Sequence, residues 1–208
     1  MITSIDELGS ATRALSLDVS RASTHCRAFS QIADASRRYG DVFDLSLGFW
    51  KLTFQAHLAA CLQALARVYD NHRRALSMAA WLRAISSFAS DGRLSPLSQV
   101  TGENLINPTR LAQDIEYCTE NHIAERLRSL RHKALAHTAA EYAAKGENAF
   151  QTFRLEQYDI EELVGGSREI FCHYLPLFSD RRLIVQVPGQ DDFVHLLDLA
   201  GLAARLRP

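Results

Sequence analysis

The stretch that decides the fold runs from Val42 to Tyr69 and reads VFDLSLGFWKLTFQAHLAACLQALARVY. It contains no proline, and its apolar residues recur every three or four positions, which is the period of an α-helix. This stripe consists of Leu45, Phe49, Leu52, Ala56, Ala59, Leu62, Ala66 and Tyr69. The other faces are also largely apolar, so the pattern predicts a long, well-buried helix at the centre of a helical bundle.

A second long helix is predicted upstream of this stretch. It begins after Ser4 and extends to Tyr39, where Gly40 stops it. Ser4 is a favourable N-cap, and Glu7 stands three residues later, as in a capping box. The Ser and Thr residues at 16–24 leave open a break within this helix.

Further helices are predicted downstream. One spans 77–89, and a linker containing Gly, Pro and Ser follows at 91–107. Asn107-Pro108 then starts a helix, because Asn caps well and Pro fits the first helical position. Its apolar stripe continues to Ala134, with a break expected near Glu120-Asn121.

The C-terminal part of the chain predicts one more helix and a small appendage. The helix fits 159–178, although Gly165-Gly166 weakens its middle. The segment 182–187, RLIVQV, predicts a short strand that precedes a terminal helix or hairpin arm. The whole chain, 1–208, is therefore predicted to be a single all-α domain, an antiparallel helical bundle with a small C-terminal appendage.

Composition excludes several classes of protein. A net charge of −1 gives no global field that would attract nucleic acid or an acidic membrane. None of the cysteines sits in a CxxC pair, which predicts free buried thiols in a reducing compartment. The N-terminus lacks a signal-peptide pattern, and no apolar run is long enough to span a membrane. We therefore expect a cytoplasmic protein without a membrane partner.

The residues that carry chemistry lie at 126–138, RLRSLRHKALAHT. The sequence has no glycine-rich phosphate loop and no His/Cys set at metal-ligand spacing, so we expect no cofactor and no metal. In 126–138, by contrast, four Arg or Lys residues and two His residues lie close together. Histidine moves a proton near neutral pH, and arginine stabilises charge on a phosphate, which are the requirements of phosphodiester cleavage.

The motif RHKALAH at 131–137 resembles the signature of the HEPN superfamily. In that signature an arginine and a polar residue are followed, a few residues later, by a histidine near a helix end. The blocks FWKLT at 49–53, ARVYD at 66–70 and ALS at 75–77 are similar to those of the bacterial abortive-infection HEPN-like branch. The resemblance is strongest over residues 40–140.

The resemblance implies a homodimeric HEPN-like bundle that acts as a metal-independent endoribonuclease of the toxin or phage-defence type. RNA is the implied substrate, and an antitoxin protein is an implied candidate partner. A 2′-hydroxyl would attack the adjacent phosphate, which leaves 2′,3′-cyclic phosphate and 5′-hydroxyl ends. His137 would act as general acid or base and Arg131 would stabilise the phosphorane, while His132, Lys133 and Arg128 would position the substrate.

Simpler interpretations of the same residues stay open. The basic run is also typical of a solvated helix face whose cations offset the helix macrodipole. His137 is equally compatible with a buried structural histidine. Arg67 and Asp70, supporting residues upstream, lie three apart on the predicted helix and are interpreted as pairing with each other. Orientation of Arg131 by these two residues is the second option.

Two further expectations concern the site and its function. Phe49 and Trp50 are predicted to lie in the core rather than stack on bases, and His57 to be a satisfied core group. Arg131 and His137 are about 120° apart around an ideal helix, so a dimer partner is predicted to complete the site. The alternative function is a non-catalytic helical dimer that binds a partner protein or a nucleotide, because fold does not decide function.

Overall fold

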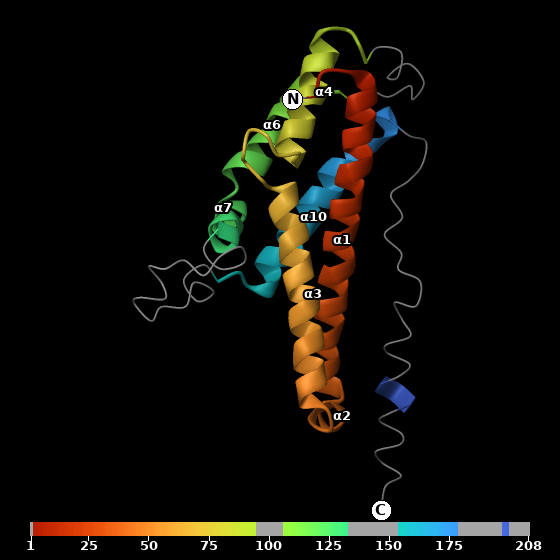
Figure 1. Cartoon of the computed structure of the whole chain (residues 1–208), viewed down its shortest axis with the longest axis vertical. Helices are drawn as coiled ribbons and strands as arrows, with labels where there is room; N and C mark the ends of the chain where they lie inside the picture. Colours follow the sequence, from red (N-terminus) through yellow and green to blue (C-terminus); the bar gives the residue numbers. More distant parts are fainter. Residues whose placement is uncertain (1, 95–105, 133–153, 179–196, 200–208) are drawn as a thin grey trace, which may run out of the picture.

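The structure is a computed structural model, which describes residues 2–94, 106–132, 154–178 and 197–199 (Figure 1). Every regular element in these ranges is helical, and the all-α bundle predicted from the sequence is confirmed. The strand predicted at 182–187 lies outside the described residues. None of the described helices combines the length and apolar character needed to cross a membrane.

The first helix, α1, spans Ile5–Arg38 without a break. Ser4 caps it as predicted, because the Ser4 hydroxyl accepts a hydrogen bond from the Glu7 N–H at 3.1 Å. The Glu7 carboxylate accepts from the Thr3 N–H at 2.7 Å, so it does not close the predicted capping box on Ser4. The Ser23 hydroxyl donates to the Val19 carbonyl within the helix, which explains why the polar stretch does not interrupt α1.

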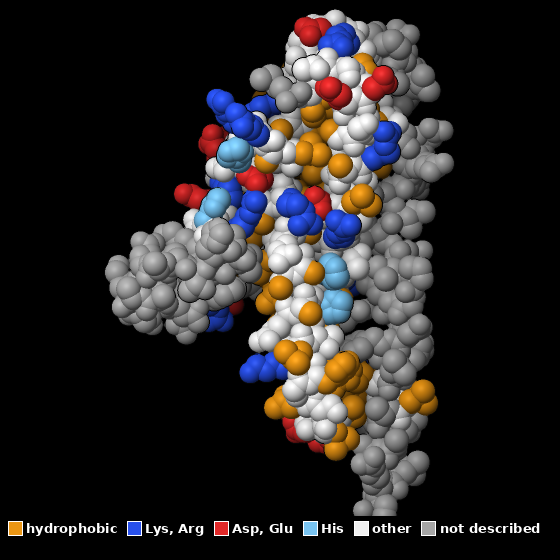
Figure 2. Space-filling model, in the orientation of Figure 1, with side chains coloured by type: hydrophobic (Ala, Val, Ile, Leu, Met, Phe, Trp, Pro, Cys, Tyr) orange, Lys and Arg blue, Asp and Glu red, His pale blue; other side chains and the backbone are white. Residues whose placement is uncertain are grey.

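The central stretch forms two helices, α2 (Gly40–Asp44) and α3 (Leu47–Val68), rather than one. α3 runs antiparallel to α1, and α2 closes the end of this hairpin (Figure 1). The prediction of a well-buried central helix is wrong for its first half, where Leu45, Phe49 and Leu52 are 63%, 61% and 69% exposed. Figure 2 shows hydrophobic side chains gathered at this end of the hairpin.

The second half of α3 is buried because more helices cover it. Its buried residues are Cys61, Leu62, Ala64, Leu65, Ala66 and Val68. These residues lie in one core cluster with residues of α1, α7 (His122–Leu130) and α10 (Gln157–Tyr174). The main hydrophobic core therefore lies at one end of the long α1–α3 hairpin, away from α2.

Side-chain caps fix the starts of three helices near this core. Ser77 caps α4 (Met78–Ser90) and Asn107 caps α6 (Pro108–Glu120), which confirms both predicted starts. The predicted break near Glu120-Asn121 is also confirmed, because the Asn121 side chain accepts from the Ile123 and Ala124 N–H groups and starts α7. Each cap satisfies N–H groups that have no partner inside the helix.

The last long helix, α10, continues through Gly165-Gly166 and is followed by a 3-10 turn, η2 (Leu175–Leu177). Gly166 serves a close approach, since a Cβ there would lie 2.8 Å from the Cζ atom of Tyr117 on α6. At Gly165 a Cβ would meet nothing within 4 Å. Gly166 therefore permits the close approach of Tyr117 to α10, and neither glycine ends the helix.

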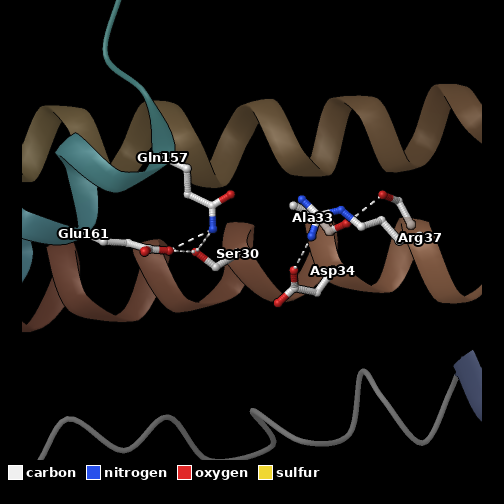
Figure 3. Close-up of polar contacts among 7 residues, drawn as sticks. Ser30, Ala33, Asp34, Arg37, Gln157 and Glu161 are labelled. Carbon is white, nitrogen blue, oxygen red and sulfur yellow. Dashed lines mark hydrogen bonds and ion pairs between the residues drawn. The ribbon is translucent and has the colours of Figure 1, made fainter.

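Polar contacts join α10 to α1 on the surface (Figure 3). The Ser30 hydroxyl donates to Glu161 at 2.9 Å, and the Gln157 amide donates to both Ser30 and Glu161. Further along α1, Arg37 pairs with Asp34 at 3.3 Å. The contacts of Gln157 and Glu161 with Ser30 hold the start of α10 against the second half of α1.

Trp81 of α4 fills the centre of the main core. Its indole stacks on Phe171 with ring centroids 5.2 Å apart, and its Nε1–H donates to the Thr12 hydroxyl at 2.9 Å. The cysteines are free, but the prediction that all are buried is wrong for one of them. Cys26, Cys61 and Cys118 are buried, whereas Cys172 is exposed.

Candidate functional site

The predicted catalytic motif begins where α7 ends. Residues 131 and 132 continue the helix as a π-helical turn, a widening that often accompanies functional sites. Arg131 is half-buried there and His132 is exposed. Lys133 and His137 lie outside the described residues. The geometry of the site is therefore the geometry of Arg131 and its surroundings.

Arg131 is held on one side by α3 and the residues that follow it. Its Nη1 atom donates to the carboxylate of Asp70 and, at 3.3 Å, to the carbonyl of Ala66. Among the described residues, neither Nε nor Nη2 of Arg131 has a partner, and 35% of the side chain is exposed. The guanidinium is thus fixed through one nitrogen and retains donors for an anion.

Asp70 uses both carboxylate oxygens. Oδ2 accepts from Arg131, and Oδ1 accepts from the His72 N–H at 2.8 Å. Burial raises the pKa of Asp70, but the hydrogen bonds from Arg131 and His72 outweigh that effect and hold the pKa below its ordinary value. Asp70 is therefore ionised at neutral pH and binds the Arg131 cation.

The interpretation that Arg67 and Asp70 pair with each other is wrong. Arg67 donates through Nε and Nη2 to Asp18 of α1, at 2.9 and 2.7 Å. α3 ends at Val68, so Asp70 lies beyond the helix and the three-residue spacing does not place it beside Arg67. Asp70 instead turns towards the end of α7 and binds Arg131, so the second option, the orientation of Arg131, holds for Asp70 and not for Arg67.

Arg128 joins the ends of two other helices. Its Nη1 donates to the carbonyl of Tyr69, the C-cap of α3, at 3.2 Å. Its Nη2 donates to the carbonyl of Thr119 in the last turn of α6, at 3.1 Å. Burial lowers the pKa of this guanidinium. Arg128 thus braces the helix that carries the motif, and its contact with substrate stays a prediction.

The aromatic residues predicted for the core divide into two kinds. Phe49 is exposed, so the prediction is wrong there. Trp50 is half-buried and stacks on Phe43, with ring centroids 4.6 Å apart. It belongs to a small second cluster at the α2 end of the hairpin. That cluster forms because α2 folds back on α1 and α3 there.

His57 has a partner that local sequence patterns did not reveal. Its Nδ1 lies 2.9 Å from the Nδ1 of His25 on α1, and both rings are half-buried. Partial burial lowers the pKa of both imidazoles, and the charges of His57 and Arg21 lower that of His25 further. The pair lies 32 residues apart in sequence, so only the pairing of α1 with α3 brings it together. Within the described ranges, no group of three or more His, Cys, Asp or Glu residues is arranged to hold a metal ion.

Comparison with known proteins gives one match. The family model HEPN_AbiU2, described as AbiU2, matches residues 5–194 and so covers most of the chain. That range contains Arg67, Asp70, Arg131 and His137. No curated protein and no solved structure matches the sequence.

Proposed function

The chain belongs to the AbiU2 family of HEPN-like abortive-infection proteins, and on that premise we propose that it is a metal-independent endoribonuclease of the toxin or phage-defence type. Arg131 and His137 act at the scissile phosphate of RNA. The observation that carries the proposal is the fixation of Arg131 by Asp70 and Ala66, which leaves its other nitrogens without a partner among the described residues.

The reaction needs proton transfer and charge stabilisation. The RNA 2′-oxygen loses its proton and bonds to phosphorus, while the bond to the 5′-oxygen breaks and that oxygen gains a proton. The products are a 2′,3′-cyclic phosphate and a 5′-hydroxyl. His137 serves as general acid or base, since imidazole exchanges protons near neutral pH. Arg131 stabilises the added negative charge on the phosphorane.

Asp70 supports this role by positioning Arg131 before substrate binds. A guanidinium already oriented by a carboxylate does not have to reorganise in the transition state, which is the condition for strong electrostatic stabilisation. Because Asp70 stays ionised at neutral pH, the orientation persists over the pH range in which histidine works.

The proposal includes a homodimer. Arg131 and His137 diverge by about 120° on a regular helix, and a two-fold axis would bring two such sets together. Light scattering at micromolar concentration should therefore report a dimer. A strictly monomeric protein would require both residues to meet within one chain.

The test is cleavage of a structured RNA by the purified protein in EDTA. Cleavage should proceed and leave cyclic-phosphate and 5′-hydroxyl ends, while DNA, which lacks the 2′-hydroxyl, should survive. His137→Ala should reduce the rate about 10²- to 10⁴-fold, and Arg131→Ala by a comparable factor. Asp70→Asn should reduce it by up to about 10²-fold, because the guanidinium loses its alignment.

The control is Arg37→Ala, which breaks an exposed ion pair near the other end of α1 and should leave the rate unchanged. Loss of cleavage in EDTA would contradict the metal-independent mechanism. Full activity in His137→Ala would contradict the catalytic assignment. Absence of cleavage with retained binding of a partner protein or nucleotide would favour the non-catalytic dimer.

A further inference from the structure

A groove between α1 and α4 lies outside the motif that the proposed function uses. It has a volume of about 610 Å³ and is bordered by the first turns of α1, the connection from α3 to α4, and one face of α4. Figure 2 shows hydrophobic side chains exposed on the upper part of this face, where Figure 1 draws α4 beside α1, with both basic and acidic side chains around them. The lining of the groove itself combines apolar residues with three arginines and one glutamate.

The cations of the groove are not neutralised within the described chain. Arg73, Arg74 and Arg83 line it and are exposed, and no described acidic residue forms an ion pair with any of them. Arg67 and Arg131, by contrast, are each paired with an aspartate. The groove therefore presents three exposed arginines that have no acidic partner in the part of the chain that the structure describes.

One carboxylate also lines the groove, and it is already engaged. Glu7 accepts hydrogen bonds from the Thr3 N–H and the Thr3 hydroxyl at 2.7 and 2.9 Å. The lining remains net positive with three arginines against one glutamate. The N-terminal end of α4, which Ser77 caps beside this groove, adds a positive helix end. The field in the groove therefore favours an anion with several charges.

The apolar side of the groove indicates that the ligand also has an uncharged, apolar part. Small and aliphatic side chains form it: Ile2, Ala11, Ala75, Leu76, Ala80 and Ala84. These side chains offer a surface for a flat, uncharged group, and guanidinium planes stack on bases. A ligand with both phosphates and bases satisfies the two parts of the lining, whereas a simple anion satisfies only the arginines.

The connection between α3 and α4 links this groove to Arg131. Asp70, which holds Arg131, and Arg73, which lines the groove, are three residues apart. Three residues of extended chain span at most about 11 Å, so the two sites are neighbours on the surface. An RNA strand with its scissile phosphate at Arg131 can therefore continue over this connection into the groove.

We propose that the groove binds nucleotides of a single-stranded RNA segment next to the cleavage position, with Arg73, Arg74 and Arg83 on its phosphates and its bases against the apolar side. The proposal rests on the proposed function, because it assigns the groove to the substrate of that site. Single-strand binding by a cationic groove depends steeply on salt, and each phosphate contact contributes about 0.7 to the slope of log K against log salt.

The test is binding of a short single-stranded 2′-O-methyl RNA, which cannot be cleaved by attack of a 2′-hydroxyl. Fluorescence anisotropy over a range of salt concentrations compares wild type with the double variant Arg73→Gln/Arg74→Gln. The variant should lose roughly tenfold or more in affinity at moderate salt, and its slope should become less steep by about 1.4. Arg83→Gln should reduce the slope by about 0.7.

The chain offers a matched control in a second arginine pair. Arg37→Gln/Arg38→Gln removes the same charge at the other end of α1, about 45 Å from Glu7. This variant should retain wild-type affinity and slope. Circular dichroism and melting temperature should be unchanged in the groove variants, because the substituted side chains are exposed and form no ion pair with described residues.

The outcomes distinguish failure of the groove proposal from failure of the proposed nuclease activity. Equal affinity and slope in wild type and Arg73→Gln/Arg74→Gln would overturn the groove proposal even if RNA is cleaved. If binding is weakened in that variant but the wild-type protein does not cleave RNA, the groove proposal is upheld and the proposed nuclease activity is contradicted. Competition by free AMP as strong as by the oligonucleotide would show that the occupant is a free nucleotide, which also overturns the proposal.

Discussion

The two halves of α3 both contain many apolar residues, yet their surroundings differ. Leu52 in the first half is 69% exposed, whereas Leu65 in the second half is fully buried. Leu65 belongs to the main core, which also contains residues of α1, α7 and α10, whereas Leu52 does not. A large apolar side chain on this helix is therefore buried where several helices meet and exposed where they do not.

The functional elements follow the same division. Asp70 and Ala66, which hold Arg131, lie at the covered end of α3, where three helix ends meet. Arg128 ties these ends together through the carbonyls of Tyr69 and Thr119. At the α2 end, the described residues form the small second cluster around Phe43 and Trp50. The covered end is thus where a side chain can be positioned rigidly.

The largest expected difference between the halves comes from equal truncations in one helix. Leu65→Ala should reduce the free energy of unfolding by about 2 to 5 kcal/mol, because it opens a cavity in the main core. Leu52→Ala should change it by less than about 0.5 kcal/mol, because the side chain is already in solvent. Urea denaturation of both variants measures the two values. Equal losses would contradict the division of α3.

The next comparison uses the two adjacent glycines of α10. Gly166→Ala should destabilise the protein by about 1 to 3 kcal/mol, since the new methyl group meets the Tyr117 ring. Gly165→Ala should stabilise it by about 0.5 to 1 kcal/mol, because nothing lies near the methyl group and Ala favours the helix. Thermal melts of the two variants show directly whether each substitution raises or lowers the melting temperature. A stabilised Gly166→Ala protein would mean that α6 and α10 are not closely packed.

A smaller difference is expected between two aspartates. Asp70→Asn should cost about 1 to 2 kcal/mol at neutral pH, because the bonded Arg131 loses its charged partner. Asp34→Asn, in the exposed pair with Arg37, should cost well under about 1 kcal/mol.

The Asp70 effect also has a pH signature. The folded protein lowers the pKa of Asp70, so its contribution is present above the unfolded pKa and is lost as pH falls through the lower folded value. The stability gap between wild type and Asp70→Asn should therefore close in acid below about pH 4. A gap that is the same at neutral and acid pH would show that charge is not its origin.

The smallest expected effect concerns His25 and His57, at the boundary between the two halves. Folding lowers both pKa values, so the neutral rings are favoured and stability falls as pH drops below about 6.5. His57→Gln removes one titrating ring and the charge that lowers the pKa of His25. Its melting temperature should thus fall less than that of wild type between about pH 7.5 and 5.5. If the melting temperatures of the variant and wild type fall equally, the His25–His57 pair is not the cause of the pH dependence.

Local chemistry made the helix starts predictable. Ser4, Asn107 and Asn121 cap helices through bonds to N–H groups two or three residues away, so the signal lies within a few positions. The exposure of Leu52 could not be predicted in this way. An apolar stripe shows which face of a helix can be buried, but it does not show which other helices will cover that face. Phe49 was misplaced for the same reason.

The candidate site shows the same limit. Arg131 was identified from its motif, but its partner Asp70 lies 61 residues away, and the choice between Arg67 and Arg131 depends on where α3 ends. The i,i+3 rule applies only inside a helix, and Asp70 stands outside one. Two of the three groove arginines are adjacent on the α3–α4 connection, and the third lies on α4. No single sequence motif contains all three, so the sequence did not predict the groove.

The distribution of the cysteines gives this protein a natural chemical handle. Cys26, Cys61 and Cys118 are buried, which keeps their thiols out of reach of a reagent in solvent. Cys172 is exposed near the end of α10. A maleimide dye or spin label added to the folded wild-type chain should therefore attach at a single position on the helix that packs against α1 and α3, so distances to that helix can be followed without introducing or removing a residue.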